Sequence, residues 1–159
     1  MIINLKKLIY IFIALGFVNC KTSKVDKFDS TGTYKLGDYD IDSDEETMEY
    51  FGEIQVKQIN SDKILMTFMI NKGAPSYNFG SFIDTLKIEK RIAIYKTPEF
   101  DESCKITFVF DKTGVTVNEE TKDFNSGCGF GHAVVAKGYF RKVSSDVPVL
   151  RNPMTNEKI

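Results

Sequence analysis

Tryptophan is absent from this chain, histidine occurs once and cysteine three times, and the formal net charge at pH 7 is only −1. A charge so close to zero gives no strong field that would attract nucleic acid, so we expect no nucleic-acid partner. The scarcity of histidine and cysteine leaves few ways to build a metal site or an activated nucleophile. We therefore expect neither a cofactor nor a metal ion.

Motifs of common enzyme classes are also missing. The sequence contains no Gly-x-Ser-x-Gly, His-Glu-x-x-His or Cys-x-x-Cys pattern. His132 stands beside Phe130 and Ala133 without a serine or cysteine partner and an orienting acid, and such a histidine is more often structural than catalytic. Of the three functions considered below, an enzyme of unknown chemistry in the cell envelope is therefore the one that the sequence favours least.

One acidic stretch matches part of a calcium-binding loop. Asp38, Asp40, Asp42 and Glu49 fall at positions one, three, five and twelve of the loop frame, but position six is Ser43 where an EF-hand requires glycine. The same acids alternate with apolar residues, as they do in a strand with one solvated face. We expect a solvated acidic edge rather than a calcium site.

The longest apolar run lies at the N-terminus. Lys6 and Lys7 precede eleven uninterrupted apolar residues, Leu8 to Val18. A membrane-spanning helix needs about 20 apolar residues, so this run is too short to span a bilayer. A basic start followed by about 7–15 apolar residues is the layout of a secretory signal.

The segment that ends at Cys20 resembles the signal of bacterial lipoproteins, in which the cysteine becomes the first residue of the mature chain and is acylated. The resemblance implies a signal peptide over residues 1–19, lipid attachment at Cys20 and a polar tether over residues 20–32. Each buried methylene contributes about 0.8 kcal/mol, so the acyl chains would anchor the protein on a membrane of the cell envelope.

The neighbours of Cys20 refine this expectation. Lys21 stands where enteric lipoproteins retained in the inner membrane have aspartate, which favours the outer membrane, on its periplasmic or surface face. The family prefers leucine three residues before the cysteine and glycine or alanine directly before it, where this chain has Phe17 and Asn19. A secreted protein cut after Gly16 and an uncut chain are the alternatives.

The rest of the chain alternates apolar and polar residues with a period of two, which is typical of β-strands. Glu53–Ile59 and Lys63–Ile70 flank a short turn-forming segment, as do Lys105–Phe110 and Val115–Val117, and this spacing predicts hairpins. We count about eight strands over residues 33–142. The expected fold is all-β, either a small antiparallel meander barrel or a two-sheet sandwich.

Three local expectations accompany this fold. Gly114 should adopt the left-handed conformation of a bulged turn. The one helix candidate is Ser43–Phe51, where Ser43 and Glu46 match a capping box. Residues 143–159 are polar with two prolines and are expected to form a C-terminal tail.

The two cysteines that remain after Cys20 are expected to form a disulfide. Cys104 begins a strand whose even-numbered residues are apolar, so its side chain should point to the buried face, and Cys128 lies in a glycine-rich loop before the last strand. In an oxidising envelope they pair most simply with each other. Two separate buried thiols are the alternative.

Two loops combine glycine with aromatic, asparagine and serine residues, a common recognition composition. They are Asn71–Phe82 and Asn125–His132. The candidate binding residues in them are Tyr77, Asn78, Phe79, Phe82, Phe130 and His132. In the structural interpretation, which we favour, these aromatic residues fill the ends of the barrel instead.

The layout Cys-x-Ile-x-Phe-x-Phe, Cys-Gly-Phe-Gly-x-x-Val and Gly-Tyr between Cys104 and Tyr139 resembles uncharacterised small all-β bacterial lipoproteins. The architecture is loosely similar to periplasmic lysozyme inhibitors. These resemblances imply a non-catalytic envelope lipoprotein that binds a protein or a small apolar ligand through loops at the end of the barrel. The first alternative is a lysozyme-type hydrolase inhibitor.

Overall fold

The computed structural model describes residues 28–37 and 47–159. The expected signal peptide, Cys20 and most of the tether lie outside the described residues. Asp38, Asp40 and Asp42 of the calcium-loop frame also lie outside them, as does the first half of the helix candidate. The described second half, residues 47–51, is not helical, and Phe51 already belongs to a strand.

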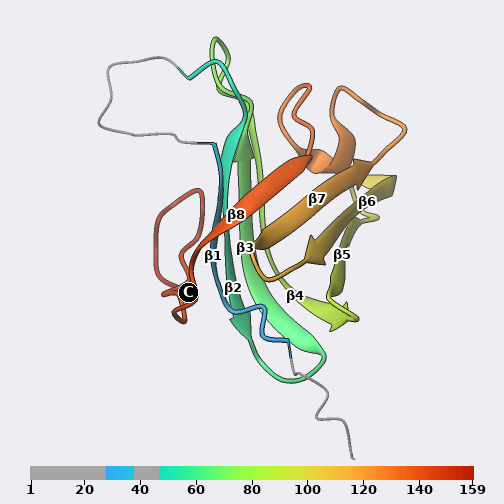
Figure 1. Ribbon diagram of the computed structural model, residues 1–159. Coiled ribbons are helices and arrows are strands. Elements are labelled where there is room, and N and C mark those ends of the chain that lie inside the picture. Colours follow the sequence, from blue (N-terminus) through green and yellow to red (C-terminus); the bar gives the residue numbers. More distant parts are fainter. Residues whose placement is uncertain (1–27, 38–46) are drawn as a thin grey trace, which may run out of the picture.

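The fold is an eight-stranded antiparallel barrel in which each strand pairs with the next and the last pairs with the first (Figure 1). This confirms the all-β prediction and selects the barrel from its two alternatives. Within the described residues, the one helical element is a 3₁₀ turn at Gly127–Gly129. The strands are β1 (Gly32–Leu36), β2 (Phe51–Gln58), β3 (Lys63–Asn71), β4 (Phe79–Glu89), β5 (Ile92–Thr97), β6 (Asp101–Phe110), β7 (Gly114–Glu120) and β8 (Gly138–Ser144).

Alternating side chains fill the interior of the barrel. Both β3 and β6 bury their even-numbered apolar side chains, and for β6 the sequence predicts this. Phe68 lies at the centre of this core, with its ring centroid 5.3–6.1 Å from those of four other phenylalanines. Those four are Phe82, Phe108, Phe130 and Phe140. At this strand number the interior is just wide enough to be filled by side chains, and here aromatic rings fill it.

The turn before β7 differs from the sequence-based expectation. Gly114 is buried as the first residue of β7, and its φ is not positive, so the predicted left-handed conformation is wrong. Its glycine identity has another reason, because a Cβ there would lie 2.4 Å from the carbonyl oxygen of Phe140. The turn is instead organised by Asp111, whose carboxylate accepts hydrogen bonds from the backbone N–H groups of Thr113 and Gly114.

The meander gives the barrel two different ends. We call the end formed by the tight turns at residues 59–62, 90–91 and 111–113 the turn end. The opposite end, formed by residues 47–50, 72–78, 98–100 and 121–137, is the loop end (Figure 1). The described chain begins at the turn end, where the guanidinium of Arg91 lies 4.6 Å from the ring centroid of Phe28. The N-terminal segment therefore joins the barrel at the end opposite to the loops.

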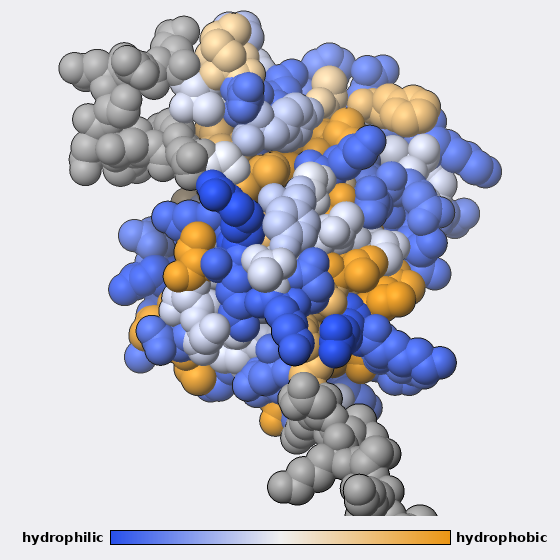
Figure 2. All heavy atoms as spheres, viewed as in Figure 1, coloured by the Kyte–Doolittle hydropathy of each residue, from blue (hydrophilic) through white to orange (hydrophobic). Residues whose placement is uncertain are grey.

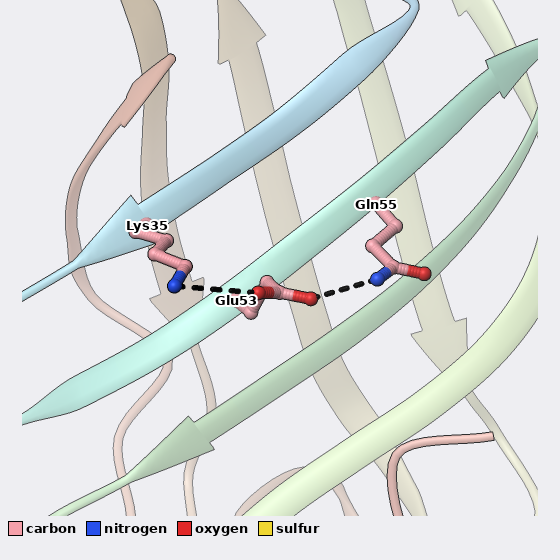
Figure 3. A network of polar contacts seen from close by, with 3 residues as sticks. All are labelled: Lys35, Glu53 and Gln55. Atoms are coloured by element: carbon pink, nitrogen blue, oxygen red, sulfur yellow. Dashed lines mark hydrogen bonds and ion pairs between the residues drawn. The ribbon is translucent and has the colours of Figure 1, made fainter. Parts of the chain in front are cut away.

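Residues on both sides of the expected 33–142 domain pack against the barrel. Ser30 is fully buried, and its hydroxyl donates a hydrogen bond to Oε1 of Gln58 at 2.7 Å. After β8, Leu150 is 5% exposed, and the N–H of Arg151 donates to Oε1 of Gln55 at 3.3 Å. Gln55 in turn donates to Glu53, which lies 4.0 Å from the ammonium of Lys35 (Figure 3).

Candidate binding site at the loop end

The loop end is closed by the ring of Phe130. This ring stacks on Phe68 with a centroid separation of 6.1 Å, and the side chain is 7% exposed. Gly80 of β4 makes room for it, because a Cβ at that position would come within 2.2 Å of the ring. The N–H of Gly131 then donates to the carbonyl oxygen of Phe79 at 3.0 Å and fixes the loop to β4. The ring of Phe130, which we call the plug, is therefore held in place by ring packing and by a main-chain hydrogen bond.

The two loops chosen from the sequence meet at this end. The carbonyl oxygen of His132 accepts a hydrogen bond from the side-chain amide of Asn78 at 3.0 Å and another from the ammonium of Lys72 at 3.2 Å. Asn71 stabilises the first loop internally, since its side-chain amide donates to the carbonyl oxygen of Tyr77 at 3.0 Å. These two hydrogen bonds thus join the two loops through the main chain of His132.

The six predicted binding residues have different exposures. Phe82 and Phe130 are each 7% exposed and belong to the core, as the structural interpretation of these loops expects. Phe82 of β4 stacks on Tyr95 of β5 with a ring separation of 3.7 Å, whereas the two strands pair through the last two residues of β4 and the first two of β5. Phe79 is 40% exposed, His132 is also exposed, and Tyr77 and Asn78 are half-buried. Phe79 is therefore the predicted aromatic residue best placed to contact a partner.

A disulfide joins Cys104 of β6 to Cys128 of the 3₁₀ turn, with a Cα–Cα distance of 5.0 Å, which confirms the predicted pairing. Polar contacts surround it. Asp101 accepts hydrogen bonds from the hydroxyls of Ser103 and Thr121, both at 2.6 Å. We call this group of contacts between β6 and the β7–β8 loop the clamp.

The carboxylates of the clamp region are stabilised in their ionised form. Hydrogen bonds from the side chains of Ser103 and then Thr121 lower the pKa of Asp101 from 3.8 to about 2. The side chain of Ser126 is the main cause of the lowered pKa of Asp123. Both groups therefore remain negatively charged under mildly acidic conditions, and their hydrogen bonds persist.

We expect Asp101→Asn to lower the stability of the folded state at pH 7 and to have progressively less effect as the pH falls from about 4 to about 2. Because the pKa of Asp101 is lower in the folded than in the unfolded chain, its ionised form stabilises the folded state above pH 4, and this contribution is lost as protonation occurs. Urea unfolding midpoints of both proteins measured across pH 2–7 test this. A difference between wild type and variant that stays constant over that range would contradict it.

Two aromatic residues of the loop end were not among the predicted binding residues. Phe100 and Phe124 are 78% and 74% exposed, the highest values among large apolar side chains of the described residues. An open hollow of about 460 Å³ lies between their chain segments, and apolar side chains stand out among hydrophilic ones at this end in Figure 2. The hollow is lined by Asp101, Glu102, Ser103, Lys122 and Asp123. Phe100 and Phe124 are hard to find from the sequence, because each is a single apolar residue inside a polar turn.

Among the described residues, no helix has the length and apolar character needed to cross a bilayer. Within the same residues, histidine, cysteine, aspartate and glutamate side chains do not converge in a group of three or more that could hold a metal ion. Comparisons with protein families, with curated proteins and with solved structures find no match for this chain. We therefore infer the function from the geometry of the barrel and from the N-terminal sequence.

Proposed function

We propose that this protein is a lipid-anchored, non-catalytic envelope protein that binds a partner protein through the loop end of its barrel. The observation that supports this most directly is the separation of the two ends. The chain arrives from Cys20 at the turn end, beside Arg91, whereas the exposed aromatic residues lie at the loop end. A lipid at Cys20 would leave the loop end free to meet a partner.

The length of the connecting segment is consistent with this orientation. Eight residue steps separate Cys20 from Phe28, where the described barrel begins. A fully extended chain covers at most about 3.5 Å per residue, so the segment reaches about 28 Å. The turn end would thus stay near the membrane surface.

The packed interior favours a protein partner over a small apolar ligand. The central positions are fully buried phenylalanine, isoleucine and valine side chains, and the end of the barrel is plugged by Phe130. A ligand inside the barrel would have to displace these rings, each of which contributes several kcal/mol to stability. Loops held on a rigid barrel, in contrast, can bind a protein surface with little loss of conformational entropy.

Replacing Cys20 tests the proposed anchor. We expect the wild-type protein to sediment with membranes and to incorporate radiolabelled palmitate, and Cys20→Ser to lose the label and leave the membrane fraction. Thr22→Ser, a conservative change in the same segment, serves as the matched control and should behave as wild type. A Cys20→Ser protein that still sediments fully with membranes would refute the lipid anchor.

Inhibition of a lysozyme-type hydrolase is the second candidate function. The observation that favours it is the clamp, because inhibitors of enzymes present loops that are rigid before binding. The test is lysis of bacterial cell walls by lysozyme in the presence of an excess of the purified protein. Undiminished lysis would remove this candidate and would leave the proposed binding role in place.

A further inference from the structure

Phe100 and Phe124 are exposed although the structure around them is fixed. Phe100 directly precedes Asp101 and packs on Gly129, where an added Cβ would lie 3.2 Å from the phenylalanine ring. Phe124 directly follows Asp123, whose carboxylate accepts hydrogen bonds from the N–H of Asn125 and the hydroxyl of Ser126. Both side chains therefore stand on well-connected turns, and their exposure is not a consequence of loose local structure.

Leaving two phenylalanines in water forgoes about 1.5–3 kcal/mol of burial energy each. Single exposed apolar side chains are common on protein surfaces and need no explanation. Two large aromatic residues on the chain segments that flank one hollow, next to the strand and the loop that the disulfide joins, are a different case. Aromatic anchors of this kind dominate the energetics of protein interfaces.

The charge around the hollow indicates the chemistry of the partner. Its lining includes three acidic residues, Asp101, Glu102 and Asp123, against one basic residue, Lys122. Glu99, next to Phe100, adds a further exposed acid. A partner with an acidic surface would be repelled here, whereas a basic surface would match the charge.

We propose that the hollow beside Phe100 and Phe124 is the docking surface for a lysine- or arginine-rich face of a protein partner. This inference rests on the proposed function, because it specifies the partner of the same loop end. The two rings provide apolar and cation–π contact for the stems and charged groups of the basic side chains. Glu102, an exposed acid in the lining, supplies charge complementarity at the rim.

Two basic probe proteins, egg-white lysozyme and cytochrome c, test this inference with the full-length protein extracted in a nonionic detergent. Each probe is used in its native form and after succinylation, which reverses the charge of its lysines. We expect both native probes to bind at 50 mM salt, to bind at least 10-fold more weakly at 300 mM salt, and to lose binding after succinylation. Equal binding of native and succinylated probes, or no binding of either native probe, would overturn the inference.

Variants locate the binding surface. The double variant Phe100→Ser and Phe124→Ser should weaken binding at least 30-fold, and Glu102→Lys at least 10-fold. Val147→Ser with Val149→Ser is the matched control, because these exposed apolar residues lie beyond β8, and it should change binding less than twofold. Unchanged unfolding midpoints verify that every variant is folded. Wild-type affinity in the double phenylalanine variant would refute the site.

The same variants separate this inference from its competitors. Binding of the protein to vesicles of phosphatidylethanolamine and phosphatidylglycerol that depends on Phe100 and Phe124 would identify a lipid contact and overturn the protein-docking proposal. If Cys20 is acylated but the probes do not bind, only the docking inference fails. If the probes bind through the two phenylalanines but Cys20 is not acylated, only the proposed anchor fails.

Discussion

Replacing Phe68 with alanine is expected to lower the free energy of unfolding by about 3–5 kcal/mol. The side chain is fully buried in β3, and its ring contacts four other phenylalanine rings across the barrel. Truncation removes the apolar area of the ring and leaves a cavity that the strands cannot collapse to fill, because they are closed into a barrel. Phe130, which stacks on Phe68 and closes the loop end, should also lose packing contacts.

Urea denaturation followed by tyrosine fluorescence and far-UV circular dichroism measures this change. Phe100→Ala is the matched control, since the same side chain is removed from a position that is 78% exposed, and we expect a change of at most about 0.5 kcal/mol. If both variants lost similar stability, Phe68 would not be at the centre of the core.

Removing the disulfide is expected to cost about 3 kcal/mol. The bond closes a segment of 24 residues, and in the chain-entropy model a closed loop of this length restricts the unfolded state by about that amount. Cys104→Ser with Cys128→Ser should therefore lower the thermal midpoint by about 10 °C in a chain of this size. The strands should still form, because the ladders of β6 with β5 and β7 do not involve the sulfur atoms.

Reduction of the wild-type protein with dithiothreitol provides the control for the serine substitutions, because it breaks the same bond without changing the sequence. The reduced wild type and the double variant should unfold at similar urea concentrations. A double variant as stable as the oxidised wild type would contradict a stabilising role for this bond. We also expect both proteins to bind the basic probes more weakly, because loss of the disulfide weakens the contact between β6 and the β7–β8 loop.

The strand content of the barrel was predictable because the alternation is strict. β3 and β6 each bury every second side chain, and this period of two is visible in the sequence. The cysteine pairing was predictable on other grounds, because Cys104 and Cys128 are the two cysteines that remain once Cys20 is assigned to lipid. The period of two predicted only that Cys104 faces the core. Closure into a barrel was not, because it depends on the pairing of β1 with β8, more than 100 residues apart, and alternation does not specify which strands are neighbours.

The loop end was less predictable. Phe82 and Phe130 belong to loops whose composition is typical of recognition sites, but tertiary packing places both rings in the core. At the turn end, Gly114 matched a turn pattern, yet its glycine identity is explained by the close approach of β8. Phe100 and Phe124 lie in polar turns without periodicity, so only the three-dimensional arrangement of the clamp shows that they share one surface. Local sequence specifies the strands well and the long-range contacts of loops poorly.

The intact mass of the protein extracted from membranes tests the central claim most directly. We expect a chain that begins at Cys20, carries two or three acyl chains and is two hydrogens lighter than the fully reduced chain, because Cys104 and Cys128 are joined. A protein that retains its first nineteen residues and carries no added lipid would contradict the claim.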